Sequence, residues 1–486
     1  MAGRRLSETA AAAAPALLAP DLCVIGAGTA GLAVATAAAA FGVPVVLVER
    51  DRMGGETGSS AIAALASAGA RAQAIREAGR FGLVVGEPEI RDPALHDHVQ
   101  RVIAARRPNV SAERLTALGA TVVSGEARFV SRSTVVVGEQ TIKARRFVVA
   151  TGARSALPDI PGLDDLPHLT EESLASLTRR PESLIVLGGA PSAAALAQAL
   201  ARLGSRVALV EPAGLLPDED PEAVAILRRT LLREGVSLHE KRTILRAEAF
   251  KKGLRLVLTG EGEGSEAVVE ADHILVAGRR VPDIAGLDLE LAGVAASAEG
   301  IRVDAGLRCT NRRVYAIGDC AAGATGGAGG AEEQARLVLR NALFRQRGRF
   351  DPAAIPRVTL TQPAIAHVGL GEAEAQRQRA IRVLRWPYAE SDAAQAGRTT
   401  DGFVKLLTDV KGRLLGATIV GPQAGELIAS WSVALAAGRS VQDMAALPMP
   451  LPSLAEVSKR AATSFLTPLA TRPGLRRLIG WLRRLG

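Results

Sequence analysis

The sequence predicts an α/β protein that contains two βαβ units and ends in a smaller α+β domain. A glycine-rich turn between an apolar strand and an Ala-rich helix occurs twice, and the pattern of strands and helices changes after residue 356. A chain of 486 residues is also too long for one hydrophobic core, since domains hold on the order of 100–200 residues. The 48% hydrophobic and 22% charged shares are ordinary for a globular protein, so we expect two or three packed domains.

Both βαβ units have the order strand, turn, helix, strand and acid. The first turn reads Gly26-Ala27-Gly28-Thr29-Ala30-Gly31, and its unit ends in Glu49. The second reads Gly188-Gly189-Ala190-Pro191-Ser192-Ala193, and its unit ends in Glu211. Each acid stands 23 positions after the first glycine of its turn, and this repetition is stronger evidence than a single glycine-rich turn. The expected strands span 22–25, 43–48, 183–187 and 206–210, and the expected helices span 32–41 and 194–203.

The glycines of the first turn match the requirements of a Rossmann-like dinucleotide site. Gly26 allows the tight turn, Gly28 lets the backbone approach a pyrophosphate, and Gly31 permits close packing of helix on strand. The phosphates would lie on the helix N-terminus, where free N–H groups favour negative charge, and Glu49 would bind ribose hydroxyls. The alternative is a βα turn with a structural role only.

The second turn departs from this pattern at the position that faces the phosphates. Ala190 replaces the glycine that lets a pyrophosphate approach, whereas Ala193 stands where alanine is tolerated. Glu211 favours a free ribose 2′-hydroxyl and therefore NAD over NADP. We expect NAD(P)H to bind here weakly, with NADH favoured, and the alternative is a vestigial site.

Further strands and helices follow from hydrophobic periodicity. A mixed pattern from Pro356 onward indicates a separate α+β domain. The expected strands span 121–123, 134–137, 146–152, 254–258, 273–277, 313–319, 357–361, 403–408 and 414–420, and the expected helices span 222–234, 372–378 and 426–437.

Charge and composition exclude several classes of function. The net charge is +9, but five arginines lie in residues 471–486 without an acid, so no basic groove for nucleic acid is indicated. The three cysteines, Cys23, Cys309 and Cys320, have no close spacing, and we expect buried, inert thiols. His96 and His98 lie two positions apart without a nearby cysteine, which does not predict a metal site.

With these motifs the chain resembles the class I pyridine nucleotide-disulfide oxidoreductases, which include dihydrolipoamide dehydrogenase and mercuric reductase. The resemblance covers roughly residues 22–470. The motifs that carry it are residues 24–31, Met53-Gly54-Gly55-Glu56, Ala150-Thr151-Gly152, the second glycine-rich turn, Gly278-Arg279-Arg280, Ala316-Ile317-Gly318-Asp319, 416–428 and 450–456.

The resemblance implies that the first unit binds FAD, the second binds NAD(P)H and the last domain forms a homodimer. The implied cofactor-binding residues are Gly26, Gly28, Gly31, Glu49, Gly55, Thr57, Ala127, Thr151, Gly152, Gly188, Glu211, Gly278, Gly318 and Asp319. The implied domains are a flexible N-terminal tail (1–20), an FAD-binding domain in two parts (21–155 and 281–350), an NAD(P)-binding domain (156–280), a dimerisation domain (351–470) and a basic amphipathic tail (471–486).

Three departures affect the chemistry that the resemblance implies. Thr57 occupies the position of the family's first redox cysteine, the second falls in an apparent deletion before Gly58, and Ser60 replaces a lysine. Met449 replaces the acid–base histidine and cannot move protons. A hydroxyl forms neither a thiolate nor a disulfide, so disulfide reductase activity is predicted to be absent and the catalytic residues stay unknown.

The third departure is a glycine-rich run, residues 320–330, after Asp319. We expect this run to be flexible, with a helix that starts near Ala331 and points its N-terminus at the flavin.

Two functions remain. The first is an FAD-dependent oxidoreductase that passes electrons from NAD(P)H to a non-disulfide, small-molecule acceptor such as a quinone. The second is a degenerate, non-catalytic flavoprotein or dimeric scaffold of the same family. We expect a cytoplasmic protein without a signal peptide or membrane-spanning segment.

The C-terminal tail is amphipathic. Its apolar residues recur at helical spacing, with arginines opposite and Trp481 near the boundary, which is typical of a helix at an anionic lipid surface. This interpretation predicts a peripheral contact with the inner face of the membrane, and the alternative is a terminal helix docked on the protein. The apolar residues are Leu475, Leu478, Ile479, Leu482 and Leu485.

Overall fold

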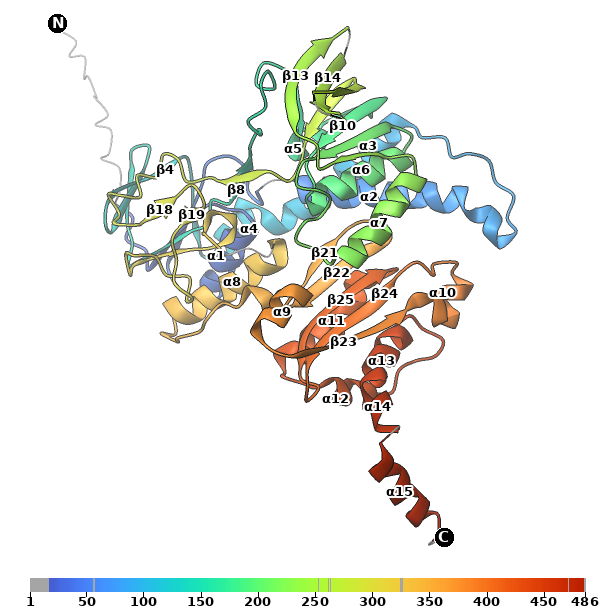
Figure 1. The fold of residues 1–486 in the computed structure, drawn as a ribbon. Coiled ribbons are helices and arrows are strands. Elements are labelled where there is room, and N and C mark those ends of the chain that lie inside the picture. Colours follow the sequence, from blue (N-terminus) through green and yellow to red (C-terminus); the bar gives the residue numbers. More distant parts are fainter. Residues whose placement is uncertain are drawn as a thin grey trace, which may run out of the picture. The chain divides into compact units, whose positions relative to one another are not determined.

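The computed structural model describes residues 17–484 except 56, 252, 261, 263, 324–326 and 471. The chain forms two compact units (Figure 1). Unit 1 comprises Met1–Gly55, Arg107–Arg154 and Val281–Phe350, and unit 2 comprises Glu56–Arg106, Ser155–Arg280 and Asp351–Gly486. Of the N-terminal tail expected to be flexible, residues 1–16 lie outside the described residues. Leu18 forms a bridge with Ile142.

Unit 1 is centred on a five-stranded parallel sheet in the order β20-β7-β1-β2-β3. Its inner strands are short apolar runs that are buried except at Glu49 and Arg146, as expected for a sheet covered on both faces. The strands are β1 (Leu22–Ile25), β2 (Val45–Glu49), β3 (Thr121–Ser124), β7 (Arg146–Val149) and β20 (Val314–Ala316).

Two helices of unit 1 pack against each other, α1 (Thr29–Ala40) and α8 (Gly327–Ala342) (Figure 1). The small side chains of α1, mostly alanine, allow this close approach and are largely buried. Smaller elements complete the unit: α4 (Ala112–Ala117), the antiparallel strands β4 (Ala127–Ser131), β5 (Thr134–Val137) and β6 (Gln140–Lys143), the short strands β18 (Ala296–Ser297) and β19 (Gly300–Ile301), and the 3-10 helices η2 (Arg107–Val110) and η3 (Gly318–Cys320).

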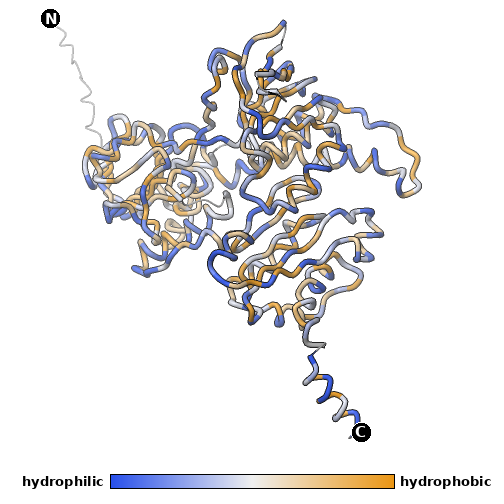
Figure 2. The backbone as a smooth tube through the Cα atoms, viewed as in Figure 1, coloured by the Kyte–Doolittle hydropathy of each residue, from blue (hydrophilic) through white to orange (hydrophobic). Residues whose placement is uncertain are grey.

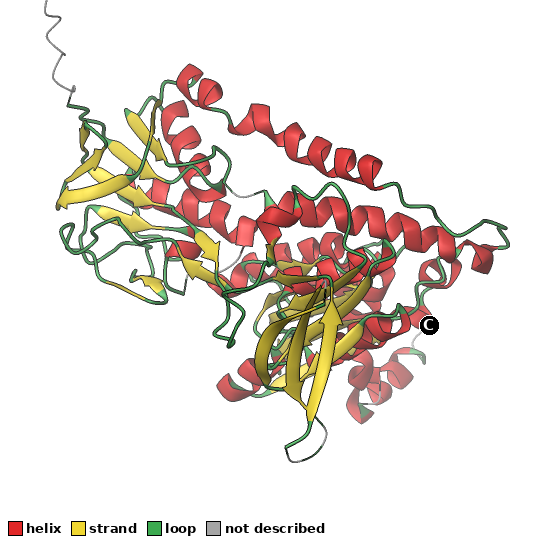
Figure 3. Ribbon diagram, turned by 90° about the horizontal axis from the view of Figure 1, so that it is seen from above, coloured by secondary structure: helices red, strands yellow, loops and turns green. Residues whose placement is uncertain are grey.

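Unit 2 contains a second five-stranded parallel sheet, in the order β12-β11-β10-β16-β9. Figure 3 shows helices lying beside the strands of the sheets. The elements are β9 (Leu169–Thr170), β10 (Ser183–Leu187), β11 (Arg206–Glu211), β12 (Ser237–Glu240), β16 (His273–Val276), α2 (Gly58–Arg76), η1 (Ala78–Phe81), α3 (Asp92–Arg106), α5 (Glu171–Leu174), α6 (Pro191–Arg202), α7 (Pro221–Arg233) and the antiparallel strands β13 (Ile244–Phe250), β14 (Gly253–Thr259) and β15 (Glu266–Ala271). The short strands β8 (Ala153–Ser155) and β17 (Arg280–Pro282) lie at the boundaries between the two units.

The C-terminal part of unit 2 has a five-stranded antiparallel sheet in the order β21-β22-β25-β24-β23, with its own apolar core. The fully buried Trp431 donates its indole N–H to Ser458 Oγ at 3.2 Å. The elements are β21 (Arg357–Thr359), β22 (Ala364–Gly369), β23 (Ile381–Pro387), β24 (Phe403–Asp409), β25 (Leu414–Gly421), α9 (Glu372–Gln378), α10 (Asp392–Ala396), α11 (Ala424–Ala436), α12 (Val441–Ala446), α13 (Ala455–Thr463), α14 (Thr467–Ala470), α15 (Pro473–Leu482) and the 3-10 helices η4 (Pro352–Ala354), η5 (Tyr388–Glu390) and η6 (Ser464–Leu466).

The predicted fold class is confirmed: the chain has two parallel βαβ sheets and a C-terminal α+β domain. Several expected ends differ by a few residues; the expected strand 313–319, for example, stops at Ala316 and is followed by η3. One helix start was wrong. The helix after the glycine-rich run begins at Gly327, one turn before the expected Ala331. The buried side chains of Ala331, Ala335 and Val338 pack into the core of unit 1, and we attribute the extra turn to this packing, which offsets the low helix propensity of the preceding glycines. Residues 324–326 of the run lie outside the described residues.

Candidate functional site

In unit 1 the predicted cofactor residues gather at one edge of the parallel sheet. Gly26 follows β1, Glu49 ends β2, Thr151 follows β7 and Asp319 follows β20. These positions are the carboxyl ends of neighbouring parallel strands, the edge at which α/β sheets bind ligands. Ala127 begins β4, just after Gly125 donates its N–H to the carbonyl of Glu49.

Two glycines of the first turn are required by the packing of the protein itself. Gly26 has φ +100°, and an added Cβ would lie 2.4 Å from the carbonyl oxygen of Ala150. A Cβ on Gly31 would lie 1.9 Å from the carbonyl oxygen of Gly26. Both distances are below van der Waals contact, so any side chain at either position would displace backbone.

Gly28 differs from both. Its φ of −70° and ψ of −174° are open to any residue, and an added Cβ would meet none of the described atoms within 4 Å. It is the N-cap of α1, and no side chain accepts a hydrogen bond there from the first turn of the helix. Packing therefore does not explain the glycine, whereas the close approach of a phosphate to free helix amides does. The residues present fit a dinucleotide.

Polar groups around the turn support the same fit. Glu49 Oε2 accepts the N–H of Ala27 at 2.5 Å, and its Oε1 accepts that of Asp51 at 2.9 Å, so the carboxylate is held beside the turn. Among the described residues, the buried Thr151 Oγ1 has only the weakly donating thiol of Cys320 beside it, which leaves most of its hydrogen-bonding capacity for a ligand. Gly318 donates its N–H to Gln334 Oε1 on α8 at 2.6 Å.

Gly55 lies against the first turn. Gly54 donates its N–H to the carbonyl of Ala27 at 2.9 Å, and a Cβ on Gly55 would lie 3.0 Å from Gly28 Cα. Gly152, next to Thr151, has φ +72° and accepts the N–H of Asp283 at 3.0 Å. Unit 1 thus brings together ten of the predicted residues: Gly26, Gly28, Gly31, Glu49, Gly55, Ala127, Thr151, Gly152, Gly318 and Asp319.

The other four predicted residues belong to unit 2. Thr57 is the N-cap of α2 and forms no side-chain cap. On the same helix Ser60 Oγ accepts a hydrogen bond from Arg106 Nη1 at 3.1 Å. Residues 54–61 contain no cysteine.

The second glycine-rich turn repeats the backbone of the first, but its N-cap is altered. Gly188 has φ +135°, and a Cβ there would lie 1.9 Å from the carbonyl oxygen of Ala277. The N-cap of α6 is Ala190, whose methyl would lie 2.3 Å from a Cβ on Gly278. Pro191 occupies the first helical turn and removes one amide N–H from the helix end. The space beside the N-cap is open at Gly28 in the first turn. In the second turn the equivalent space is narrower, because Ala190 carries a methyl group.

Glu211 and Gly278 both have partners in the protein. Glu211 Oε1 accepts the N–H of Ala213 at 2.9 Å, and Gly189 packs on the Glu211 side chain. Gly278 donates its N–H to Glu171 Oε1 at 2.9 Å, and Glu171 is buried. Sequence analysis did not identify the Ala190–Gly278 and Glu171–Gly278 contacts, because they join residues far apart in the chain.

All three cysteines are free and buried. Burial raises the pKa of the Cys23 thiol to about 12 and raises the pKa values of Cys309 and Cys320 as well. The prediction that the three thiols are buried is confirmed. Thiols with raised pKa values are poor nucleophiles. In the described part of the chain, no group of three or more His, Cys, Asp and Glu residues could hold a metal ion. Glu456 forms an ion pair with Arg460 one turn later on α13.

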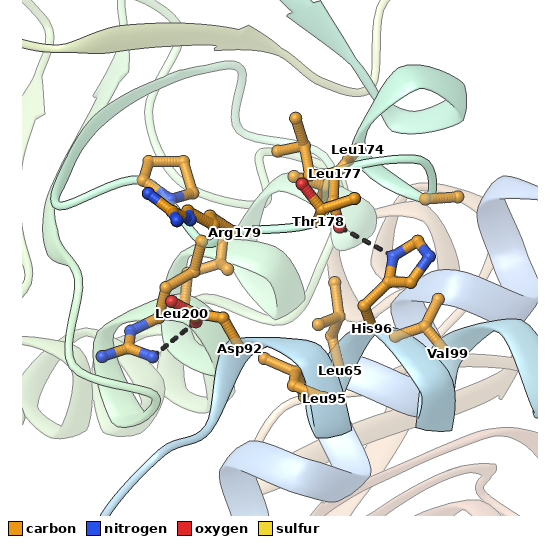
Figure 4. Close-up of a pocket in the computed structure, with 13 residues that line it drawn as sticks. Leu65, Asp92, Leu95, His96, Val99, Leu174, Leu177, Thr178, Arg179 and Leu200 are labelled. Atoms are coloured by element: carbon orange, nitrogen blue, oxygen red, sulfur yellow. Dashed lines mark hydrogen bonds and ion pairs between the residues drawn. The ribbon is translucent and has the colours of Figure 1, made fainter.

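A small pocket in unit 2 lies between α3 and the segment that leads from α5 to β10 (Figure 4). The Asp92–Arg180 ion pair (2.6 Å) lies on one side, and on the other His96 Nδ1 lies 2.9 Å from the carbonyl of Leu177. Its volume of about 30 Å³ admits a water molecule but no cofactor.

Comparison with known proteins identifies the family. Residues 20–342 match the pyridine nucleotide-disulphide oxidoreductase family, and residues 355–462 match the dimerisation domain of that family, which points to a homodimer. The chain is 34% identical to a mercuric reductase from Streptomyces lividans, covering 93% of this chain and 97% of the relative. It is 33% identical to a dihydrolipoyl dehydrogenase from Thermus scotoductus, covering 91% and 96%.

Solved structures agree with these matches. The structure of LpdA from Mycobacterium tuberculosis is 25% identical, with a TM-score of 0.82 over 91% of this chain and 99% of that chain. The flavoprotein disulfide reductase RclA from Escherichia coli has the same fold, with a TM-score of 0.77 over 90% of this chain and 98% of that chain. Proteins of the matched family bind FAD and use NAD(P)H. This chain therefore belongs to the pyridine nucleotide-disulphide oxidoreductase family.

Proposed function

We propose that this protein passes electrons from NADH through FAD to a non-disulfide acceptor such as a quinone. The observation that carries the proposal is at position 28. Packing does not require a glycine there, whereas the approach of a bound dinucleotide does. FAD would be bound by the ten residues gathered in unit 1, and NADH by Gly188, Glu211 and Gly278 in unit 2. We accordingly assign residues 21–155 and 281–350 to FAD, 156–280 to NAD(P)H and 351–470 to dimerisation.

The absence of an available thiol supports a non-disulfide acceptor. Thr57 and Ser60 stand in the run in which the family has its redox cysteines, and Cys23, Cys309 and Cys320 are all buried. When bound, FAD accepts a hydride and passes electrons on without requiring a protein dithiol. The residues of this chain would then bind and orient the two nucleotides.

Glu211 supports a preference for NADH. Its carboxylate ends β11, where it would accept a hydrogen bond from a ribose hydroxyl and repel a 2′-phosphate. The same carboxylate already accepts the N–H of Ala213 through one oxygen, which leaves the other for a ribose.

An acceptor panel tests the proposal. Purified protein with NADH should reduce a quinone or an artificial dye, whereas lipoamide, glutathione disulfide and mercuric ion should not be reduced above background. Prior alkylation with iodoacetamide should leave dye reduction unchanged. If alkylation of one cysteine abolished dye reduction, or if lipoamide were turned over as fast as the dye, the chain would contain a working thiol and the proposal would fail.

A second candidate function is a non-catalytic flavoprotein or dimeric scaffold. The Ala190 methyl against Gly278 and the missing amide at Pro191 favour it, because both weaken the phosphate end of the second site. Flavin that copurifies but is not reduced by NADH at any concentration would favour this function over the first.

We further propose that α15 gives the protein a peripheral location on the cytoplasmic face of the membrane. No residue of α15 is buried, and blue and orange alternate along it in Figure 2, as they do in an interfacial helix. None of the described helices is both long and apolar enough to cross a bilayer. Sedimentation with anionic liposomes should be stronger for the full chain than for one ending at Ala470, and equal sedimentation would exclude α15 as an anchor.

A further inference from the structure

A second exposed apolar surface lies in unit 1, remote in sequence from α15. Phe41, the residue after α1, is 66% exposed, and Phe344, just after α8, is 54% exposed. Their rings meet edge to face with centroids 5.5 Å apart. Aromatic side chains are normally buried, so two adjacent exposed rings indicate a contact surface.

Four arginines lie within five residues of Phe344 in the sequence. Arg340, Arg345, Arg347 and Arg349 are all exposed, and residues 334–350 contain no acid. Arg345, Arg347 and Arg349 form no ion pair with any residue that the structure describes, and Arg340 donates a hydrogen bond to the neutral Gln346 at 2.7 Å. We call Phe41, Phe344 and these four arginines the Phe–Arg patch.

The loop that carries the arginines is fixed to the protein. Gly348 donates its N–H to Asn341 Oδ1 at 2.9 Å, and the carbonyl of Gly348 accepts a hydrogen bond from Asn341 Nδ2 at 3.2 Å. Phe350 donates its N–H to the carbonyl of Ala305 at 2.8 Å. The patch is therefore an ordered surface, so its cations need little ordering when they bind a partner.

The distribution of charge over the chain indicates what kind of surface the patch binds. The four arginines of the patch and the five in residues 471–486 equal the net charge of +9, which leaves 50 basic residues against 50 acidic ones. Both segments are locally rich in arginine, and both also expose large apolar side chains. Cations beside exposed apolar groups complement an anionic phospholipid surface, where the rings enter the interface and the arginines meet headgroups.

We propose that the Phe–Arg patch is a second membrane-binding surface, specific for anionic phospholipid and separate from α15. The patch itself combines an apolar and a cationic contribution, and the binding strength of interfacial segments scales with both. The proposal extends the peripheral location proposed for α15, but it depends neither on that helix nor on the electron acceptor.

The test compares variants of the full-length flavoprotein by cosedimentation with vesicles of phosphatidylglycerol and phosphatidylcholine. Arg345→Gln with Arg347→Gln should weaken partitioning roughly 30-fold, since each basic residue near an anionic surface contributes about a fivefold factor. Phe41→Ser with Phe344→Ser should weaken it roughly tenfold. Vesicles of phosphatidylcholine alone should bind all variants equally poorly.

Matched controls have the same chemistry elsewhere. Arg377→Gln with Arg379→Gln removes two exposed arginines at the same spacing, and Leu83→Ser with Val84→Ser removes two exposed apolar side chains. Both should stay within twofold of wild type. Circular dichroism and gel filtration of every variant check that the fold and the dimer are unchanged, and a variant that lost either would be left out of the comparison.

Two further results decide the origin of binding. In a Leu478→Ser, Ile479→Ser background, which weakens the apolar face of α15, the patch substitutions should cause the same fold loss as in wild type. The proposal is overturned if the patch variants bind as the controls do, or if their loss vanishes in that background. Tighter, patch-dependent binding to a polyuridine RNA than to vesicles would also overturn it and assign the patch to nucleic acid.

Discussion

The two glycine-rich turns share a backbone but differ at the position that faces the phosphates. In the first, Gly26 donates its N–H to Val48 at 2.8 Å, and in the second Gly188 donates to Val210 at 3.1 Å. In each unit the residue after a neighbouring strand donates its N–H to the last residue of the strand before the turn. Ala150 donates to the carbonyl of Ile25, and Ala277 donates to the carbonyl of Leu187. At the helix N-cap, however, Gly28 faces open space and the methyl of Ala190 packs against Gly278.

This difference separates two demands on the same motif. The first glycine of each turn is required by the fold, because a Cβ there would strike the neighbouring strand. The third residue of the turn (Gly28 or Ala190) need not be glycine for the fold, since Ala190 has nearly the same extended backbone angles as Gly28. The fold therefore requires the first glycine of each turn, whereas we propose that phosphate binding requires the glycine at the helix N-cap, which the second unit lacks.

The largest effect is expected at Gly28. Gly28→Asp should lower the FAD content of purified protein from near one per chain to near zero, because a side chain and a negative charge would face the pyrophosphate. Flavin absorbance relative to protein measures this. Ala190→Asp is the matched control in the second unit and should leave flavin content unchanged. Retention of FAD by Gly28→Asp would contradict the assignment of unit 1.

Gly31 and Gly28 should respond differently to the same substitution. Gly31→Ala should destabilise unit 1 by about 3 kcal/mol, because its Cβ would lie 1.9 Å from the carbonyl oxygen of Gly26. Gly28→Ala should leave the stability of the flavin-free protein within about 0.5 kcal/mol. Urea denaturation of flavin-free protein measures both, and equal losses would show that Gly28 is also a packing residue.

We expect the Ala190 methyl to weaken NADH binding at the second site. Ala190→Gly should tighten NADH binding about tenfold, equivalent to about 1.4 kcal/mol, by opening the helix N-cap to the pyrophosphate. Ala193→Gly, in the same turn, should not tighten it. Stopped-flow reduction of the flavin at increasing NADH measures the affinity. If Ala190→Gly changed nothing while NADH already reduced the flavin quickly, the turn would accommodate the methyl as it stands.

A smaller, pH-dependent effect is expected at Glu240, which holds the turn after Glu211. Glu240 accepts hydrogen bonds from Arg228 and from the N–H of Leu215, and these interactions hold its pKa below the ordinary 4.5. Its stabilisation is therefore present above pH 4.5 and is lost as the pH falls through the lowered pKa. Glu240→Gln should cost about 1 kcal/mol at pH 7 and less at pH 3.5.

Urea denaturation at the two pH values checks this expectation. Glu266→Gln is the control, because Glu266 also pairs with an arginine but lies at the exposed surface, where such a pair contributes little. A loss of stability in Glu240→Gln that did not shrink at low pH would assign the effect to packing instead of charge.

Much of the fold and of the first site followed from the sequence, because both depend on local patterns. The order of apolar strand, glycine turn and Ala-rich helix along the chain predicted both parallel sheets. The spacing from Gly26 to Glu49 predicted that these two residues meet at the edge of the first sheet. What escaped prediction depends on residues distant in sequence. The Ala190–Gly278 contact and the helical start at Gly327 are set by packing partners that a local pattern does not contain.

The central claim is that electrons reach FAD from NADH and meet no protein dithiol. Anaerobic titration of the purified flavoprotein with NADH, followed by flavin absorbance, tests it most directly. FAD accepts two electrons, so one NADH per chain should bleach the flavin completely. Two NADH per chain would reveal a redox-active thiol pair, and no bleaching at any NADH concentration would show that the second site does not deliver electrons.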